Sequence, residues 1–343
     1  MVAMGSYERR IEAREIAHVL GSVMADGRGR TLFGGGPERA LDALRRLTPA
    51  HSQPYAMLEI PLIGEPSYDA FVGMSSEALI PGDSLGDGSL TAAQAVVDWA
   101  AQWSGKRPLN LFFEFDAAGG GRQLSGIHCR HRFQLEAADA FYDVTGDGWR
   151  APIYRSVVER LPKGWIAEFA AAFPGRPESF TRLELGLGIQ ARQCAENNPG
   201  YIRDCFETIG FSAYDDAMLE AIAGLVGLCP VNSLQFDIMA DGTLGETFSL
   251  VSYFEGMGAN FPALFGEGGK ASEVLMAYQT MGVADDRWHQ IAGALFARTE
   301  LQMAQKRFCE ITRLSIPCCA KAKWTSAELK MTKFYLIASA TAS

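Results

Sequence analysis

The chain has 343 residues, of which 48% are hydrophobic and 21% charged, with 36 glycines and 15 prolines. This composition excludes a disordered chain, a collagen-like chain and a small disulfide-stabilised fold. The 31 Lys and Arg residues against 40 Asp and Glu residues give a net charge of -9, which argues against a partner that is nucleic acid or an anionic membrane surface.

The N-terminal residues carry charges where a signal peptide needs an apolar stretch. No window approaches the ~18 uninterrupted apolar residues of a membrane helix, so we expect a cytoplasmic protein. The seven cysteines include no CxxC pair. We expect them to be reduced and to act mostly as small buried hydrophobic side chains.

Apolar periodicity divides the chain into helices and strands. Helices are expected over 7–24, 37–47, 91–104, 152–172, 199–228 and 258–306, the last two ranges holding more than one helix. Segments of alternating polarity between them predict strands. The segment 180–192 stands alone, whereas the others form hairpins around short turns: 55–63 with 68–74, 109–116 with 124–135, 232–240 with 246–254, and 317–324 with 329–338.

This order gives five strand modules separated by helices. Because hairpins make antiparallel neighbours, it argues against a doubly wound parallel sheet. No linker of low complexity interrupts the chain. We therefore expect an α+β fold with a helical extension over residues 1–36 and a single domain over residues 37–343.

Each predicted strand has one apolar and one polar face. In the segment 180–192, for example, Leu183 and Leu185 alternate with Arg182 and Glu184. An open sheet could leave the polar face in water. Alternatively, the strands could close into an antiparallel barrel, with the helices packed outside and the polar faces lining a lumen. We favour the barrel, because closure removes exposed strand edges.

Cations on the polar faces predict an anionic ligand in the lumen. Several cations cannot share a water-poor cavity without an anion. The acids on these faces pair with some of them, but the cations of the last hairpin have no acid on the same face of their own strands. A phosphate or diphosphate is the fitting ligand. The candidate ligand-binding residues are Arg130, Arg132, Arg182, Lys321, Lys323 and Lys333.

Two tyrosines are expected beside this anion site. Tyr335 shares a strand face with Lys333, and Tyr253 lies in the preceding hairpin. Aromatic rings next to an anion site can stabilise a carbocation and exclude water from it. The two tyrosines are therefore candidates for a carbocation shield.

These features resemble the ABBA-type (PT-barrel) aromatic and peptide prenyltransferases, whose barrel consists of five helix-hairpin modules around a solvent-filled lumen. The motifs Lys333-Phe334-Tyr335 and Lys321-Ala322-Lys323-Trp324 are similar to the strands that bind prenyl diphosphate in that family. The resemblance spans roughly residues 37–340. It implies transfer of a prenyl group, dimethylallyl or longer, from its diphosphate to an electron-rich aromatic small molecule or peptide, without a cofactor or a metal. It also implies that Glu59 positions the acceptor, and Glu59 or Glu114 would take up its proton.

The chain lacks the common motifs of other enzyme classes, and the motifs that remain are weak. The chain has no Asp-Asp-x-x-Asp, HExxH or G-x-S-x-G, and His128 and His131 are predicted on opposite strand faces, so no metal site is expected. FGGGP at 33–37 could bind phosphate at a helix N-terminus, but a turn before a helix that starts with proline explains it more simply. A non-catalytic protein that binds a peptide or a small anionic ligand, and a structural protein with a filled core, remain as alternatives.

Overall fold

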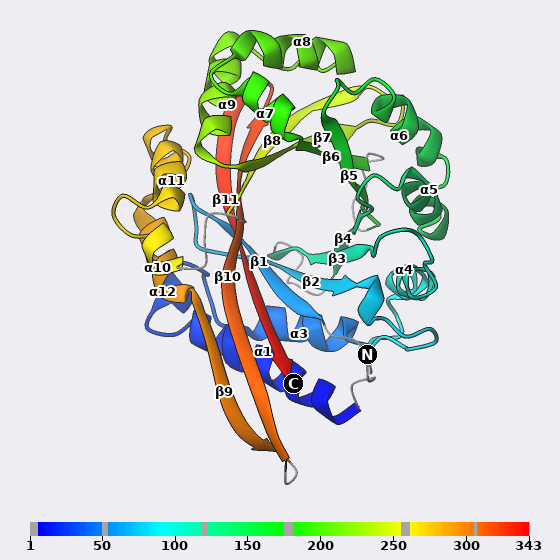
Figure 1. The fold of residues 1–343 in the computed structure, drawn as a ribbon, viewed down its shortest axis with the longest axis vertical. Helices are drawn as coiled ribbons and strands as arrows, with labels where there is room; N and C mark the ends of the chain where they lie inside the picture. Colours follow the sequence, from blue (N-terminus) through cyan, green and yellow to red (C-terminus); the bar gives the residue numbers. More distant parts are fainter. Residues whose placement is uncertain are drawn as a thin grey trace.

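The structure is a computed structural model that describes residues 6–49, 54–117, 123–174, 181–254, 261–304 and 307–342. In that part of the chain, ten strands form a closed antiparallel barrel with helices on its outside (Figure 1). The strands of the barrel are β1 (Tyr55–Pro61), β2 (Asp69–Ser75), β3 (Asn110–Phe115), β4 (Leu124–Arg130), β5 (Trp165–Ala172), β6 (Thr181–Leu187), β7 (Val231–Ile238), β8 (Leu244–Tyr253), β10 (Arg307–Thr325) and β11 (Glu328–Ala342).

The barrel closes through its first and last strands. From β1 to β8 each strand pairs with the next one along the chain. β10 then pairs with β8, β11 pairs with β10, and β11 also pairs with β1. The expected antiparallel barrel is therefore confirmed.

Helices follow the barrel around its outer surface. They are α1 (Ser6–Val23), α2 (Arg28–Thr31), α3 (Glu38–Leu47), α4 (Thr91–Ala101), α5 (Leu135–Val144), α6 (Arg150–Val158), α7 (Ile189–Ala195), α8 (Pro199–Ile209), α9 (Asp216–Leu228), α10 (Phe261–Leu264), α11 (Lys270–Thr280) and α12 (Ile291–Ala294), with short 3-10 turns at Ser76–Ala78 and Asp286–Gln290. Local signals set their ends. Before α8, the Asn198 side chain accepts a hydrogen bond from Tyr201 N at 3.1 Å, and Gly210 ends the helix with a φ of 83°.

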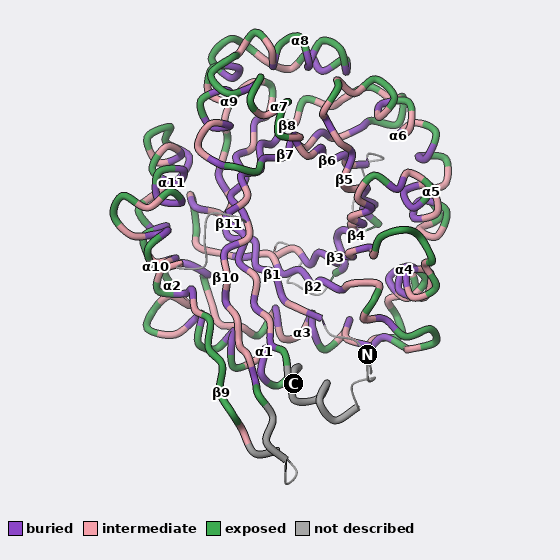
Figure 2. Tube along the Cα trace, in the orientation of Figure 1, coloured by how far each residue is buried: buried purple, intermediate pink, exposed green. Residues whose placement is uncertain are grey.

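The hydrophobic core lies between this helical layer and the outer face of the barrel. Leu183 and Leu185 of β6 are fully buried there, as the alternation of the sequence predicts. Phe206 of α8 packs against Phe236 of β7 and Phe248 of β8, with ring centroids 5.7 and 5.3 Å away. Figure 2 shows the buried positions following the strands while the helices turn exposed residues outward.

The third hairpin contains a strand that the periodicity assigns to a helix. The predicted helix 152–172 is α6 followed by β5, which pairs with β4 and β6. The sequence of β5, WIAEFAAA, is rich in alanine, a strong helix former. Its two neighbouring strands override that preference by hydrogen bonding both of its edges. β5 is therefore the hairpin partner of the strand in segment 180–192, which stands alone in the sequence pattern.

Two other segment ends also differ from expectation. The predicted strand 124–135 ends at Arg130, because Arg132 and Phe133 adopt positive φ values of 48° and 73° before α5 begins. The last part of the predicted helical range 258–306 is a strand, β9 (Phe296–Ala304), rather than a helix. β9 pairs with β10 and lies outside the barrel.

β10 changes its partner halfway along its 19 residues. Residues 307–315 pair with β9, whereas residues 319–325 pair with β8, and a bulge separates the two stretches. β9 and the adjoining parts of β10 and β11 extend beyond the barrel (Figure 1), and α1 packs on β10 and β11. Glu15 of α1 is only 1% exposed and forms an ion pair with Arg313 of β10 at 2.5 Å.

The apolar face of α1 joins the main core through Ile16, Val19, Leu20 and Val23. The boundary expected between residues 36 and 37 stays a prediction.

The FGGGP segment makes a tight turn against the β1–β2 hairpin. Gly34 has a left-handed φ of 66°, and a Cβ built there would come within 1.9 Å of the Pro66 carbonyl oxygen. We expect Gly34→Ala to lower the free energy of unfolding by about 2–4 kcal/mol, since it adds both backbone strain and a clash with backbone. Urea denaturation followed by circular dichroism measures the change.

Gly35→Ala is the matched control, because no atom lies within 4 Å of a Cβ at that position. We expect it to change the free energy of unfolding by less than about 1 kcal/mol. Equal stability of the two variants would contradict the packing of Gly34 against residue 66.

Candidate functional site

The barrel encloses a cavity of about 960 Å³, a volume suited to a small organic ligand. Every strand of the barrel contributes lining residues from its inward face. The lining includes both aromatic rings, such as Phe71, Phe112 and Phe169, and many charged groups.

Most of the residues predicted for the site line this cavity. They are Glu59, Glu114, Arg130, Arg182, Tyr253, Lys321, Lys323, Lys333 and Tyr335. Arg132 does not line it, so the prediction that it faces the lumen is wrong. The reason is that β4 ends at Arg130 and the left-handed backbone at Arg132 breaks the alternation of the strand.

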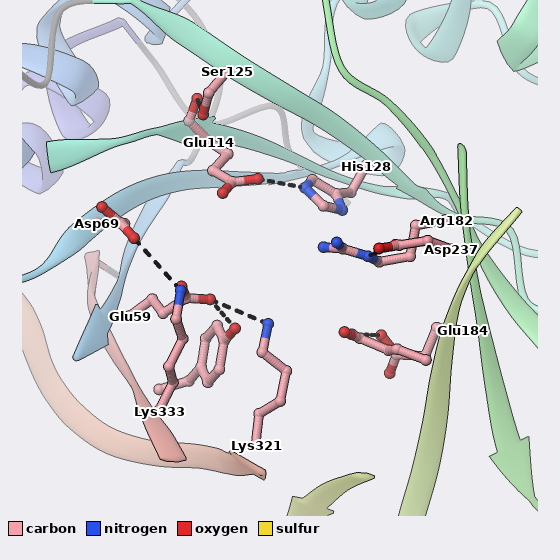
Figure 3. A network of polar contacts seen from close by, with 12 residues as sticks. Glu59, Asp69, Glu114, Ser125, His128, Arg182, Glu184, Asp237, Lys321 and Lys333 are labelled. Carbon is pink, nitrogen blue, oxygen red and sulfur yellow. Dashed lines mark hydrogen bonds and ion pairs between the residues drawn. The ribbon is translucent and has the colours of Figure 1, made fainter. Parts of the chain in front are cut away.

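Three lysines of the cavity wall, Lys321, Lys323 and Lys333, form a basic cluster, and Glu59 of β1 contacts two of them, Lys321 and Lys333. Lys321 Nζ donates to Glu59 Oε2 at 3.3 Å, and Lys333 Nζ and the Tyr335 hydroxyl also donate to this carboxylate (Figure 3). Glu59 is 3% exposed. The expectation that these cations lack an acid on their own face therefore needs correction: the pairing of β1 with β11 places Glu59 opposite Tyr335.

Glu59 and Lys333 stabilise each other's charged form, whereas Lys321 gains less from the group than it loses by burial. Burial by itself would raise the pKa of Glu59, but the charges of Lys321 and Lys333 outweigh it and lower the pKa. Burial opposes the charge on Lys333 as well, yet the attraction of Glu59 and Asp69 raises the pKa of that lysine. The pKa of Lys321 is lowered by burial, which the attraction of Glu59 only partly offsets.

Asp69 of β2 lies at the edge of the same group. Its carboxylate is 3.8 Å from Lys333 Nζ and accepts a hydrogen bond from Ala117 N at 2.7 Å. Burial and the negative charge of Glu59 raise the pKa of Asp69 to about 6. Its position on the inward face of the strand 68–74 could have identified it from the sequence, because it shares the parity of Phe71.

Lys323 differs from the other two lysines. Across the described ranges of the chain, it forms no hydrogen bond or ion pair, although its side chain lines the cavity. Burial lowers its pKa, and the charges of Arg182 and Lys333 lower it further. A negatively charged ligand would relieve this repulsion.

The other walls of the cavity carry ion pairs and a carboxylate held by neutral groups. Arg182 pairs with Asp237 at 2.9 Å and Arg130 with Glu168 at 2.7 Å. Glu184 accepts a hydrogen bond of 2.6 Å from the Tyr253 hydroxyl. The sequence could not reveal Glu168, since that residue lies in the segment predicted as a helix.

A histidine also reaches the cavity wall. His128 Nε2 lies 3.0 Å from Glu114 Oε2 (Figure 3). The His128 ring also contacts Phe71 and Phe173, with centroid distances of 6.0 and 5.6 Å. Glu114 and His128 come from the paired strands β3 and β4. The pair can exchange a proton with a ligand in the cavity.

Within the described part of the chain, no group of three or more His, Cys, Asp or Glu side chains could hold a metal ion. The six cysteines whose side chains are described are all free thiols, and Cys309 lies outside that set. Among the described helices, none is long and apolar enough to cross a membrane.

No protein-family model matches the sequence, and no curated protein matches it. Solved structures do match it. The 5-dimethylallyltryptophan synthase from Streptomyces coelicolor has a TM-score of 0.50 and 11% identity, over 94% of this chain and 95% of that chain. PriB, in a binary complex with product diphosphate, has a TM-score of 0.51 and 11% identity, over 95% of each chain. At this identity the similarity establishes the fold, which is that of the ABBA prenyltransferases.

The raised pKa of Asp69 makes the stability of the protein depend on pH. A carboxyl whose pKa rises from its ordinary value of 3.8 to about 6 on folding binds a proton more tightly when folded. Its contribution therefore favours folding less and less as pH rises from about 4 to about 6. We expect Asp69→Asn to stabilise the protein by about 1–3 kcal/mol at pH 8, and to have no such effect near pH 4.

Urea denaturation at several pH values tests this expectation. Asp204→Asn, at an exposed position on α8, is the control and should show no such trend. A loss of stability of Asp69→Asn at pH 8 would mean that the attraction of Lys333 exceeds the cost of burying the Asp69 charge.

Proposed function

We propose that the protein transfers a prenyl group from a prenyl diphosphate, dimethylallyl or longer, to an electron-rich aromatic acceptor, either a small molecule or a peptide side chain. The observation that carries this proposal is a cavity inside the closed barrel in which three lysines lie beside tyrosines and phenylalanines. The lysines suit a diphosphate, and the rings suit the cation that forms when the diphosphate leaves.

The basic cluster is the proposed diphosphate site. Lys321 and Lys333 are direct partners in the β10–β11 register, and Lys323 is two residues further along β10 on the same face. Arg182, which contributes to lowering the pKa of both Lys321 and Lys323, adds positive potential from β6. The complex of PriB with diphosphate, in a barrel of the same fold, supports a diphosphate site in this cavity.

Aromatic rings adjoin the basic cluster. Lys321 Nζ lies 5.0 Å from the centroid of the Tyr335 ring, and the Phe71 ring is 6.3 Å from Tyr335. Tyr253 lies opposite Cys319 in the β8–β10 pair. We propose that these rings cover the allylic carbon, stabilise its positive charge and keep water away from it.

The proposed reaction balances without a further reactant. The bond between the allylic carbon and the diphosphate oxygen breaks, and the electron pair stays on the diphosphate, whose charge the lysines stabilise. The aromatic ring of the acceptor then forms a bond to the allylic carbon. The proton that the acceptor loses passes to a cavity carboxylate, Glu59 or Glu114.

Incubation with dimethylallyl diphosphate and a panel of aromatic amino acids and peptides, read by mass spectrometry, tests transfer directly. The expected result is an acceptor whose mass increases by one prenyl unit. Diphosphate binding without transfer to any acceptor would instead favour the non-catalytic anion-binding protein.

Lys323→Met tests the diphosphate site without leaving a buried acid unpaired, because Lys323 forms no ion pair with any described residue. Loss of one charge-assisted contact should weaken binding of inorganic diphosphate by roughly ten- to a hundredfold in calorimetry. Lys270→Met, at an exposed position at the start of α11, is the control. Equal affinities of the two variants would contradict a diphosphate site at the basic cluster.

A further inference from the structure

We propose that Glu59 occupies the basic cluster in place of the diphosphate, and that a bound diphosphate takes over Lys321 and Lys333 and thereby frees Glu59 to act as the base. This inference rests on the proposed function. It adds to that function a coupling between binding of the prenyl diphosphate and the basicity of Glu59. A diphosphate site and a base could each exist without such a coupling.

The contacts of Glu59 carry the first step. Lys333 Nζ donates to Glu59 Oε1, while Lys321 Nζ and the Tyr335 hydroxyl donate to Glu59 Oε2. Both oxygens are therefore engaged by the groups that a diphosphate would need. The contacts join β1 to β10 and β11 across the seam that closes the barrel.

The second step is competition for these donors. A diphosphate that binds Lys321 and Lys333 competes with Glu59 for the same two ammonium groups. Leaving the carboxylate in place would bring like charges together in a buried space, where their repulsion is strongest. Lys323, which has no partner within the described residues, can contact the diphosphate before Glu59 is displaced.

The third step concerns basicity. A carboxylate that two lysines hold in its ionised form takes up a proton poorly. Once a diphosphate neutralises those lysines, they no longer lower the pKa of Glu59. Burial, which raises that pKa, then favours proton uptake. Asp69 and Glu114, which also face this space, add negative charge in the same sense. Glu59 thus becomes an effective base only when the prenyl donor is present.

The test compares the binding of inorganic diphosphate to the wild-type protein and to Glu59→Gln by calorimetry. Glutamine keeps the shape of the side chain but cannot hold the lysines by charge. We expect Glu59→Gln to bind diphosphate at least about tenfold more tightly, while it loses prenyl transfer. A role of Glu59 confined to proton uptake would leave the diphosphate affinity unchanged.

Glu114→Gln is the matched control, because it removes the same charge from a carboxylate of β3, two strands away from β1, that pairs with His128 (Figure 3). It measures the gain in affinity that comes from the lower negative charge of the cavity alone. We expect this gain to be less than about threefold, since the interaction falls with distance.

A second pair of variants covers the case in which Glu59→Gln does not fold with two buried lysines left unpaired. Lys333→Met leaves Glu59 bound to Lys321, whereas Glu59→Gln with Lys333→Met removes the ion pair as a unit and frees Lys321. We expect the double variant to bind diphosphate at least about tenfold more tightly than Lys333→Met alone.

The outcomes separate the two proposals. Diphosphate binding by the wild-type protein with no gain in Glu59→Gln over Glu114→Gln, or no gain in the double variant over Lys333→Met, overturns the coupling and leaves the proposed function intact. No diphosphate binding by any of these proteins overturns the proposed function and the coupling with it. Tighter binding on removal of Glu59 supports both.

Discussion

The pairing of the last strand with the first determines what the cavity can do. β11 hydrogen bonds to β1 over six residue pairs, including Glu59 with Tyr335 and Pro61 with Lys333. This seam completes the barrel wall around the inner polar faces. It also brings the acid of β1 among the cations of β10 and β11. The same strand pairing therefore builds the low-dielectric space and places in it the charges whose interaction that space strengthens.

The charge balance of the wall follows from this enclosure. Lys321 has Glu59, Arg130 has Glu168 and Arg182 has Asp237. A buried charge without a partner costs several kcal/mol, so a cavity wall with buried charges requires such pairing. Lys323 departs from the pattern within the described residues. Nothing in the described structure shows that this lysine stabilises the fold. Its position in the cavity wall is explained better by binding of a negatively charged ligand.

The sequence allowed the strand faces to be predicted much better than the strand partners. Alternation is a local property, so Glu59, Glu114, Arg182 and Lys333 could be placed on inward faces before any pairing was known. Which acid meets which cation depends on strand order and register, and these involve residues such as 59 and 335 that are far apart in the chain. Where local preference and tertiary pairing disagree, as in the alanine-rich β5, the periodicity indicates the wrong element.

Arg132 illustrates the limit of the alternation itself. Parity along a strand predicts the direction of a side chain only while the backbone stays extended, and no simple pattern marks the left-handed residues that end β4. The similarity to solved barrels confirms the architecture at 11% identity. It thus shows that very different sequences can satisfy the same requirement for one apolar and one polar face on each strand.

The seam between β1 and β11 also has a consequence for how the protein is made. During synthesis β1 leaves the ribosome long before β11, and until then one of its edges has no partner. Contacts between residues so distant in sequence form slowly, because the loop between them must first be ordered. The nascent chain therefore carries open strand edges, which favour aggregation and chaperone binding. Closure is the step that ends this exposure, and the enclosed cavity comes into being only with it.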